Sequence, residues 1–576
     1  MKRYILFFTL FLSVAAFAQH NEQVVIEGTY RPTLNKAGKI LIQPETPEQG
    51  FEIPDTDIEV MDIDHPFPIL LDKLSPLAYD AKKVQKNVNA ENFLLAGIGT
   101  RLSPVFFYKH NSNLTKNLAL GVGINHNSSW IDIRDYDPSS FMNNEFDISL
   151  ISKRFSGYQM GAKVYYKNDM YHYYGVDHSL LPAGYESQLE QICPKQVYNT
   201  IGTTLQLAST STRLNELKHN ARFDYHHVSE KVYNASENAL SVDYALAYDA
   251  RWWGSKENPQ RIGVDAGLQF DNCQMNTNVP NQSVLGNDIL VYKLSPYFEM
   301  KDDFYRLHLG FRVDGAAMDV ESKDHIGVHP DLSGSLFVFN KKVEFYAGLN
   351  GGRKLFTYSD MISENPFVGC AESQLVNVKM GFEGGVRTNV METVDVHVGV
   401  RYRHTENDPF YYALYPYYNR MTVDYDETRQ VSVLADVRWL ALDKLTIDAG
   451  FAYHDCTPEH FEYAVCRPTT EVRLKAGYDV NQKLSCHLDF LYEGGRYSLD
   501  NLTSLNVPFV HPYSVDGISY SKMKDIVDLG LGADYKVQDQ LTVFAKLDNV
   551  LNCKYQIYPN CPVAGIQLFV GAKMTF

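Results

Sequence analysis

Apolar and polar side chains alternate residue by residue along most of this chain, from about Asn92 to the last residue, Phe576. Because successive side chains of a strand point to opposite faces, the alternation predicts strands with one apolar and one polar face. Such strands recur in Val394 to Arg403, Val431 to Trp439 and Val527 to Val537, and the last eleven residues, from Ile566 onward, repeat the pattern. The chain is therefore expected to be all-β.

Connections between the predicted strands alternate between tight and long. Tight turns are expected at 155–157, 301–303, 340–342, 389–391, 442–444, 481–483 and 538–540. Long polar or aromatic stretches fall between them, at 127–143, 168–194, 228–237, 275–286, 319–327, 356–372, 406–427, 456–466, 499–524 and 551–563. Short periplasmic turns, long exterior loops and an even strand number are typical of bacterial barrels, so we expect a transmembrane antiparallel β-barrel of about 22 strands over residues 91–576.

The alternative is an exported soluble β-sandwich or propeller, whose strands alternate in the same way. The turns of those folds would not separate into short and long sets. Here one side of the strands is almost purely Val, Leu, Ala, Tyr and Phe, which favours contact with lipid.

The amino terminus has the form of a secretory signal peptide. A basic pair, Lys2 and Arg3, precedes an apolar run and a small-residue exit at Ala18, which predicts a signal peptide over residues 1–18. The run is shorter than the roughly 20 residues that a membrane-spanning helix needs. Residues 19–90 are rich in Pro and acidic side chains and lack periodicity, which indicates a short irregular periplasmic segment.

Composition agrees with a barrel and restricts its partners. The chain has 39 Tyr, 31 Phe and 37 Gly but a mean hydropathy of only -0.28, because the apolar face of such a barrel is hidden in alternation. Its net charge of -16 becomes -18 when the two cations of the signal peptide are removed. We therefore expect neither nucleic acid nor anionic lipid as a specific partner.

Three stretches resemble the TonB-dependent receptor superfamily, in particular its short, barrel-only (plugless) members of Bacteroidetes-type, Gram-negative bacteria. They are the barrel entry, Asn92 to Pro104; the exit, Leu541 to Asn552 with Lys554-Tyr555; and Val24 to Pro32, which is similar to the opening of a plug domain. The resemblance implies an outer-membrane transport or ligand-receptor component.

The chain departs from that superfamily before the barrel. Residues 19–90 leave no room for the complete plug domain that full members carry. A barrel of this width needs something in its lumen, so loops and the 19–90 segment fill it or the barrel leaks. Coupling to TonB stays open, and two alternatives remain: a structural barrel that docks a periplasmic or surface protein, and a passive porin.

Two sets of side chains are candidate functional residues. The first is a carboxy-terminal signal for the barrel-assembly machinery: Phe576, Met574, Gly571 and Val570. The second is a group of exterior aromatics whose rings are suited to flat ligands: Tyr173, Tyr174, Tyr411, Tyr412, Tyr415, Tyr417 and Tyr418. The alternative for the aromatics is an interfacial girdle or loop packing, and we favour that alternative.

Cysteines and lumen charges have structural interpretations. Cys456 with Cys466, and Cys553 with Cys561, each bracket one exterior loop and are candidate disulfides, with free thiols as the alternative. Lumen charges of mixed sign, such as Arg401, Arg438 and Asp534, are expected to form cross-strand ion pairs rather than a transport pathway.

No motif indicates an enzyme, a cofactor or a metal site. Asp55-x-Asp57-x-Glu59 begins like a calcium loop but lacks the turn glycine that should follow. Predicted lumen histidines such as His397 have no nucleophile motif beside them. The expected partners are therefore outer-membrane lipid, the barrel-assembly machinery, and a periplasmic or surface protein.

Overall fold

The computed structural model describes residues 92–576 except 156, 177, 179–183, 212, 253–257, 280–281, 319–325, 390–392, 414–418, 443 and 501–518. The predicted signal peptide (1–18), the 19–90 segment, and Tyr415, Tyr417 and Tyr418 lie outside the described residues.

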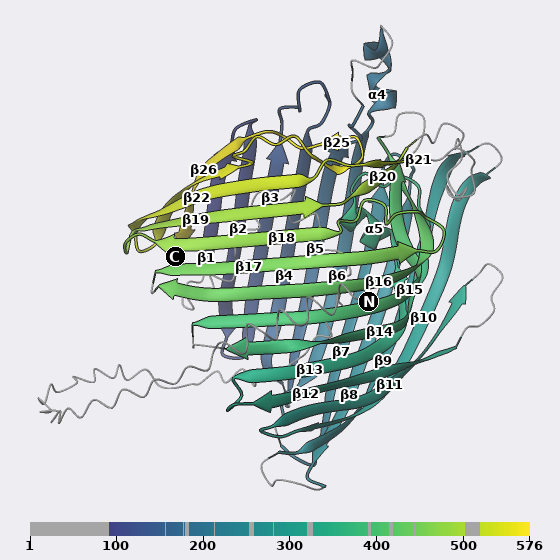
Figure 1. Ribbon diagram of the computed structural model, residues 1–576, viewed down its shortest axis with the longest axis vertical. Coiled ribbons are helices and arrows are strands. Elements are labelled where there is room, and N and C mark those ends of the chain that lie inside the picture. Colours follow the sequence, from purple (N-terminus) through teal and green to yellow (C-terminus); the bar gives the residue numbers. More distant parts are fainter. Residues whose placement is uncertain are drawn as a thin grey trace, which may run out of the picture. The chain divides into compact units, whose positions relative to one another are not determined.

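The described residues form one closed antiparallel sheet of 22 strands, which confirms the predicted barrel (Figure 1). The first half of the wall is β1 (Asn92–Gly99), β2 (Ser103–Thr115), β3 (Leu118–Ser129), β4 (Phe141–Phe155), β5 (Tyr158–His172), β6 (Lys195–Ser209), β7 (Leu217–Glu230), β8 (Ser236–Ala250), β9 (Gln260–Val279), β10 (Gln282–Lys301) and β11 (Tyr305–Met318). The second half is β12 (Gly327–Val338), β13 (Val343–Phe356), β14 (Gln374–Asn389), β15 (Val394–Ala413), β16 (Met421–Leu442), β17 (Leu445–Pro458), β18 (Thr470–Asp479), β19 (Leu484–Gly494), β22 (Ile526–Gln538), β23 (Leu541–Asp548) and β26 (Gln567–Thr575).

The barrel closes at a seam between its first and last strands. β1 pairs with β2 on one side and with β26 on the other, and backbone hydrogen bonds between Asn92 and Phe576 continue the pairing to the end of the chain. At the centre of the seam Gly97 lies opposite Gly571, where a Cβ on Gly571 would overlap the backbone of β1. We call the end of the barrel that holds Phe576 the periplasmic end and the opposite end the exterior end, following the polarity of bacterial barrels.

Wall strands differ in length around the barrel. β1 has 8 residues and β26 has 9, whereas β15 has 20 and β16 has 22. The wall is therefore low at the seam and tall around β15 and β16.

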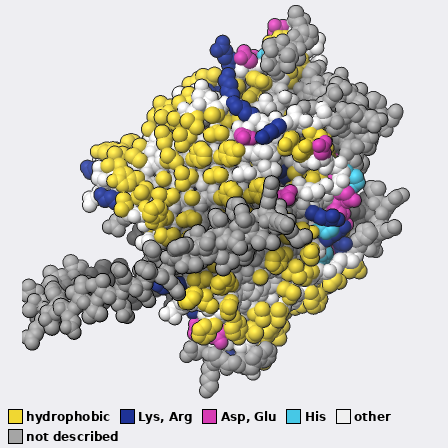
Figure 2. Space-filling view, in the orientation of Figure 1, with side chains coloured by type: hydrophobic (Ala, Val, Ile, Leu, Met, Phe, Trp, Pro, Cys, Tyr) yellow, Lys and Arg dark blue, Asp and Glu magenta, His cyan; other side chains and the backbone are white. Residues whose placement is uncertain are grey.

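The outer face of the wall is apolar, as the alternation predicted. On β15, Val398 and Val400 are 42% and 44% exposed, and on β26, Val570 is 45% exposed while its neighbour Phe569 is 5% exposed. Figure 2 shows hydrophobic side chains over most of the visible wall. Among the described residues, no helix is long and apolar enough to cross a membrane.

The predicted tight turns all fall at the periplasmic end and the predicted long connections at the exterior end. Two long connections are shorter than predicted. β9 extends to Val279 and β10 starts at Gln282. In the same way, β15 extends to Ala413 and β16 starts at Met421. The end of β15 was missed because a strand covered by protein on both faces loses its polar alternation.

Small elements occupy the exterior connections. They are the hairpins β20 (Tyr497–Asp500) with β21 (Ser519–Lys522) and β24 (Gln556–Tyr558) with β25 (Cys561–Pro562), and the short helices η2 (Tyr185–Gln188), α4 (Leu189–Ile192) and α5 (Tyr358–Glu364). Figure 1 shows α5, β20, β21 and β25 gathered toward the same end of the barrel.

Candidate functional site: a lid inside the barrel

The connection between β13 and β14, residues 357–373, forms what we call the lid. Its helix, α5, starts in a capping box: Thr357 Oγ1 accepts a hydrogen bond from the Asp360 backbone N–H at 3.2 Å, and Asp360 Oδ2 accepts one from the Thr357 N–H at 3.1 Å. This arrangement satisfies two backbone donors at the helix start. The local sequence therefore fixes where the helix begins.

The lid packs across the lumen. One buried cluster joins lid residues such as Met361, Phe367 and Val368 to residues of β6, β9, β15, β16 and β22. These strands lie in widely separated parts of the closed wall, so a cluster that touches all of them must lie inside the barrel. The exterior part of the lumen is therefore filled by packed side chains.

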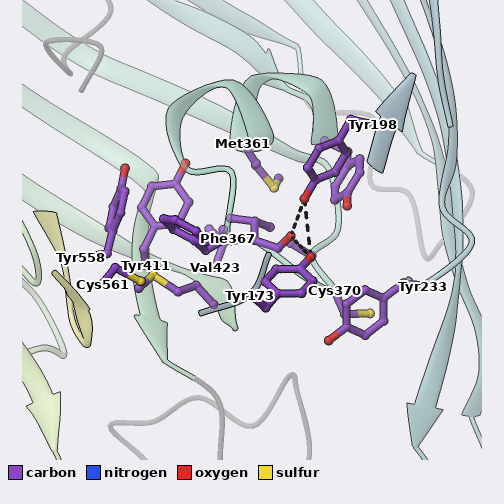
Figure 3. Packing of buried hydrophobic residues seen from close by; sticks show 14 of the residues in the cluster. Tyr173, Tyr198, Tyr233, Met361, Phe367, Cys370, Tyr411, Val423, Tyr558 and Cys561 are labelled. Atoms are coloured by element: carbon purple, nitrogen blue, oxygen red, sulfur yellow. Dashed lines mark hydrogen bonds between the residues drawn. The ribbon is translucent and has the colours of Figure 1, made fainter. Parts of the chain in front are cut away.

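Two tyrosines hold the middle of the lid (Figure 3). Tyr173, which follows β5, and Tyr198, on β6, donate hydrogen bonds from their hydroxyls to the Val368 carbonyl at 3.0 and 3.1 Å. Tyr198 also lies 3.1 Å from the Pro366 carbonyl. Buried backbone carbonyls need such partners, so the wall satisfies acceptors that the lid cannot satisfy itself.

Glu237 of β8 anchors the start of α5. Its carboxylate, which is 0% exposed, accepts the Ser359 backbone N–H at 3.0 and 3.1 Å. His226 Nε2 lies 2.9 Å from the Ser359 hydroxyl. A carboxylate at a helix N-terminus interacts favourably with the free N–H groups and the helix dipole, so the wall caps the lid helix from outside.

Glu364 anchors the other end of α5. The Tyr411 hydroxyl donates to Glu364 Oε2 at 2.6 Å, and the Tyr558 hydroxyl donates to the Glu364 backbone carbonyl at 2.7 Å. Burial raises the pKa of the Glu364 carboxyl to about 7, although the hydrogen bond from Tyr411 works in the opposite direction. The charge of this anchor therefore changes near neutral pH.

The β24–β25 hairpin packs beside the lid and is held by Arg496. This guanidinium is 2% exposed and donates to the backbone carbonyls of Ile557 and Gln556, both at 2.8 Å, and of Lys524 at 3.0 Å. Tyr174 donates to the Pro562 carbonyl at 3.0 Å. The hairpin is thus tied to the β19–β22 connection and to the β5–β6 connection.

A second buried cluster covers the opposite face of β15. It joins Phe410 and Tyr412 to Phe461, Leu499 and Met523 of the β17–β18 and β19–β22 connections. The Arg467 guanidinium donates two hydrogen bonds of 2.7 Å to the Asp408 carboxylate. Both faces of the upper β15 are therefore covered by protein.

The periplasmic part of the wall is lined with paired charges. Cross-strand ion pairs join Arg401 to Glu383 at 3.7 Å, Arg438 to Asp448 at 2.7 Å and Lys573 to Asp534 at 2.8 Å. The predicted cross-strand pairing is confirmed for Arg401, Arg438 and Asp534.

Among the described exterior aromatics, Tyr173, Tyr174 and Tyr411 pack in the lid cluster and Tyr412 packs in the second cluster. Tyr173, Tyr411 and Tyr412 are 0%, 6% and 3% exposed, and Tyr174 is half-buried with its ring 5.4 Å from that of Phe367. These positions agree with the loop-packing alternative, and contact with a ligand stays a prediction. Sequence reasoning missed Glu237, Tyr198 and Arg496 as anchors, and the Thr357-x-x-Asp360 capping box was the one local signal of the lid.

Each of the four cysteines in the candidate pairs is a free thiol in this structure. Cys466 and Cys561 are buried, and Cys456 and Cys553 are half-buried. At the carboxy terminus Val570, Met574 and Phe576 face outward, whereas Gly571 faces inward beside Phe544. Their part in assembly stays a prediction. Within the described range, no group of three or more His, Cys, Asp or Glu side chains is arranged to hold a metal ion.

Solved structures place the fold. The chain is similar to the ferric-catecholate import receptor Fiu of K12 E. coli (TM-score 0.61, 9% identity, 85% of this chain and 82% of that chain). It is also similar to the pyoverdine receptor FpvA of Pseudomonas aeruginosa PAO1 (TM-score 0.62, 12% identity, 84% and 78%) and to the copper transporter OprC (TM-score 0.59, 11% identity, 84% and 80%). No family model and no curated sequence matches the chain. The barrel has the fold of TonB-dependent outer-membrane receptors.

Proposed function

We propose that this protein is an outer-membrane receptor barrel, a non-enzymatic transport or ligand-receptor component whose lumen is closed from the exterior side by its own lid. The observation that carries the proposal is the buried cluster that joins the lid to β6, β9, β15, β16 and β22 at once. A closed lumen in a barrel of this width is what a gated receptor needs and what a general pore lacks.

The fold likeness supports the receptor class. Its structural neighbours are named as receptors or transporters of ferric-catecholate, pyoverdine and copper. We propose that a ligand reaches this barrel from the exterior and meets the outer surface of the lid first. TonB coupling and a role for the 19–90 segment in it belong to the same proposal.

Two other functions stay as alternatives. A passive porin would need an open path past the lid, which the packed cluster disfavours. A docking barrel that binds a periplasmic or surface protein is favoured by one feature, the helical projection of η2 and α4, on which Glu186, Ser187 and Glu190 are exposed.

Single-channel recording in planar bilayers tests the proposal on the full-length protein. We expect no steady current, with rare opening events, because the lid fills the exterior lumen. A steady current through the unmodified barrel would overturn the receptor proposal in favour of the porin.

A pull-down with the full-length barrel addresses the docking alternative. The receptor proposal expects the same proteins to be captured after Glu186, Ser187 and Glu190 are changed to Ala. Loss of one stoichiometric surface partner in that variant, with a silent bilayer, would favour docking instead.

A further inference from the structure

Polar side chains form a row across β3 to β6, near the exterior end of the barrel. The row consists of His126, Asn144, Asn168 and Asn199, each directly opposite the next on the neighbouring strand. His126 Nδ1 lies 2.7 Å from Asn144 Oδ1. Asn168 joins the other two amides, because its Oδ1 accepts from Asn144 Nδ2 at 3.5 Å and its Nδ2 donates to Asn199 Oδ1 at 2.8 Å. We call these four residues the first polar row.

A second polar row continues around the wall from β7 to β10. It consists of His227, Asn238, Asn272 and Asp288, again directly opposite one another. His227 Nδ1 lies 3.1 Å from Asn238 Oδ1, and Asn272 Nδ2 donates to Asp288 Oδ1. Neither row contains a lysine or an arginine. Eight consecutive strands therefore present hydrogen-bonding groups without a fixed positive charge.

Both rows lie on the outer face of the wall. Side chains two residues apart on a strand share a face. Asn168 is two residues from Tyr166, and Asn272 is two residues from Phe270; these aromatic side chains are 44% and 38% exposed on the outer face. All eight residues of the rows are half-buried. A molecule in the membrane around the barrel can therefore reach them.

The rows coincide with the exterior edge of the apolar band. On β5, Asn168 is ten residues from Tyr158, the periplasmic start of the strand, which is about 23 Å along the bilayer normal at 3.3 Å per residue and a tilt of about 45°. On β9, Asn272 is twelve residues from Gln260, or about 28 Å. The outward apolar band of such barrels is about 25 Å tall. The rows thus lie where lipid tails give way to headgroups.

Hydrogen bonds within the first row use only part of its amides. A side-chain amide has two N–H donors, and the bonds that Asn144 and Asn168 donate along the row use one each. Within the described part of the chain, no acceptor takes the second N–H of either amide. A polar group at the edge of the hydrocarbon costs free energy unless it finds a partner. Interfacial water is the simplest such partner, and a lipid headgroup is the other.

We propose that the two polar rows bind the hydroxyl-rich sugar headgroup of a glycolipid in the outer leaflet of the outer membrane. Sugar hydroxyls both donate and accept hydrogen bonds, which matches amides that present N–H and C=O groups side by side. A phosphate headgroup is instead bound best by Lys or Arg, which both rows lack. The proposal depends on the position of the barrel in the membrane and not on whether the lid opens.

Lipid retention by the full-length protein tests the proposal. The purified protein in detergent is mixed with equal amounts of a neutral dihexosyl diacylglycerol and of phosphatidylglycerol with the same acyl chains, and native mass spectrometry counts the lipids that stay bound. We expect the unmodified barrel to retain the glycolipid preferentially. The decisive variant combines Asn144→Leu, Asn168→Leu and Asn199→Leu, since leucine has the branched shape of asparagine without its polar atoms. Loss of several hydrogen bonds should weaken glycolipid binding at least about tenfold.

The matched control changes three amides that face the lumen from the same part of the wall. Asn125→Leu, Gln159→Leu and Gln206→Leu lie on β3, β5 and β6, and all three side chains are exposed on the opposite face of their strands. This variant should bind the glycolipid as the unmodified protein does. Asn238→Leu with Asn272→Leu tests the second row by itself, so the proposal stays testable if the first-row variant does not fold.

Two results would overturn the proposal. One is retention of phosphatidylglycerol as strong as that of the glycolipid in the unmodified protein. The other is equal glycolipid binding by the row variants and the lumen control, which would leave interfacial water as the partner of the amides. Planar-bilayer recording, which tests the receptor proposal, should give the same silent barrel for every variant, because the lid is unchanged in all of them.

Discussion

The exterior and periplasmic ends of β16 differ in how deeply their side chains are buried. Near the exterior, Met421 is 0% exposed and Thr428 1%, and the strand is packed against the lid and the neighbouring connections. Toward the periplasm, Trp439 and Leu442 are 44% and 63% exposed. One continuous strand therefore passes from a densely packed region to a wall with exposed outer side chains, and the opening that we propose would take place at the packed, exterior end.

The variant with the largest expected effect on this contrast is Val368→Asp in the lid. Val368 is 0% exposed, and an unpaired carboxylate there should cost the closed state about 3–5 kcal/mol. The lid should leave the lumen, and planar-bilayer recording should then show a steady current. Thr542→Asp is the control, because Thr542 has nearly the size of valine. It lies beside Lys573 on the lumen face near the periplasmic end, two residues from Phe544. A steady current from both variants, or from neither, would contradict the contrast.

A pair of arginine variants sharpens the comparison further. Arg496→Met removes the donor of three backbone carbonyls, of which the one on Ile557 is fully buried, and should destabilise the exterior end by about 3 kcal/mol. Arg438→Met removes an exposed ion pair at the periplasmic end and should cost less than about 1 kcal/mol. Hydrogen exchange of residues 555–562 and the temperature at which the folded barrel is lost in detergent measure the two effects. Similar losses of stability in the two variants would mean that the two ends of the barrel are equally well packed.

Glu364 makes the closed state depend on pH. Its pKa is raised from 4.5 to about 7 by burial, so the closed lid binds more protons than the open lid between those values. The closed state should therefore lose stability as pH rises from about 4.5 to 7, by at most about 3 kcal/mol, and change little above that range. Lid opening in bilayers should be more frequent at pH 8 than at pH 5, and Glu364→Gln should remove the difference. An equal pH dependence in the variant would assign the effect to another group.

The smallest expected effect lies in the wall between the two ends. A methyl group on Gly571 would overlap the Ala96 carbonyl oxygen and the Gly97 Cα across the seam, so Gly571→Ala should cost about 1–3 kcal/mol. Gly161→Ala on β5 would meet only the Gln206 side chain at 3.8 Å and should be nearly neutral. The unfolding temperature in detergent should fall for the first variant alone. Neither variant should pass a steady current, because the lid is intact in both.

The wall was predictable from sequence because its determinants are local. The alternation in Val394 to Val400 and in Ile566 to Phe576 assigns each side chain to a face without knowledge of the partner strand, and the turns then give the strand order. The prediction stopped where β15 acquires protein on both faces, since Phe410, Tyr411 and Tyr412 are consecutive aromatics with no polar alternation.

The lid was not predictable, because its anchors are distant in sequence. Glu237 caps a helix 122 residues later, and Tyr173 binds a carbonyl 195 residues away. Neither pairing leaves a local pattern. An aromatic in a predicted loop reads equally well as a ligand contact or as packing, and only the fold places Tyr173 and Tyr411 in a packed interior.

The unequal strand lengths also affect the membrane around the protein. At about 3.3 Å per residue and a tilt of about 45°, β16 rises about 50 Å along the bilayer normal, whereas β1 rises about 19 Å. β16 is therefore taller than a hydrocarbon layer of about 30 Å, whereas β1 is too short to span that layer. The bilayer should therefore be thinner beside the seam than beside β16. Its thickness should change gradually around the protein.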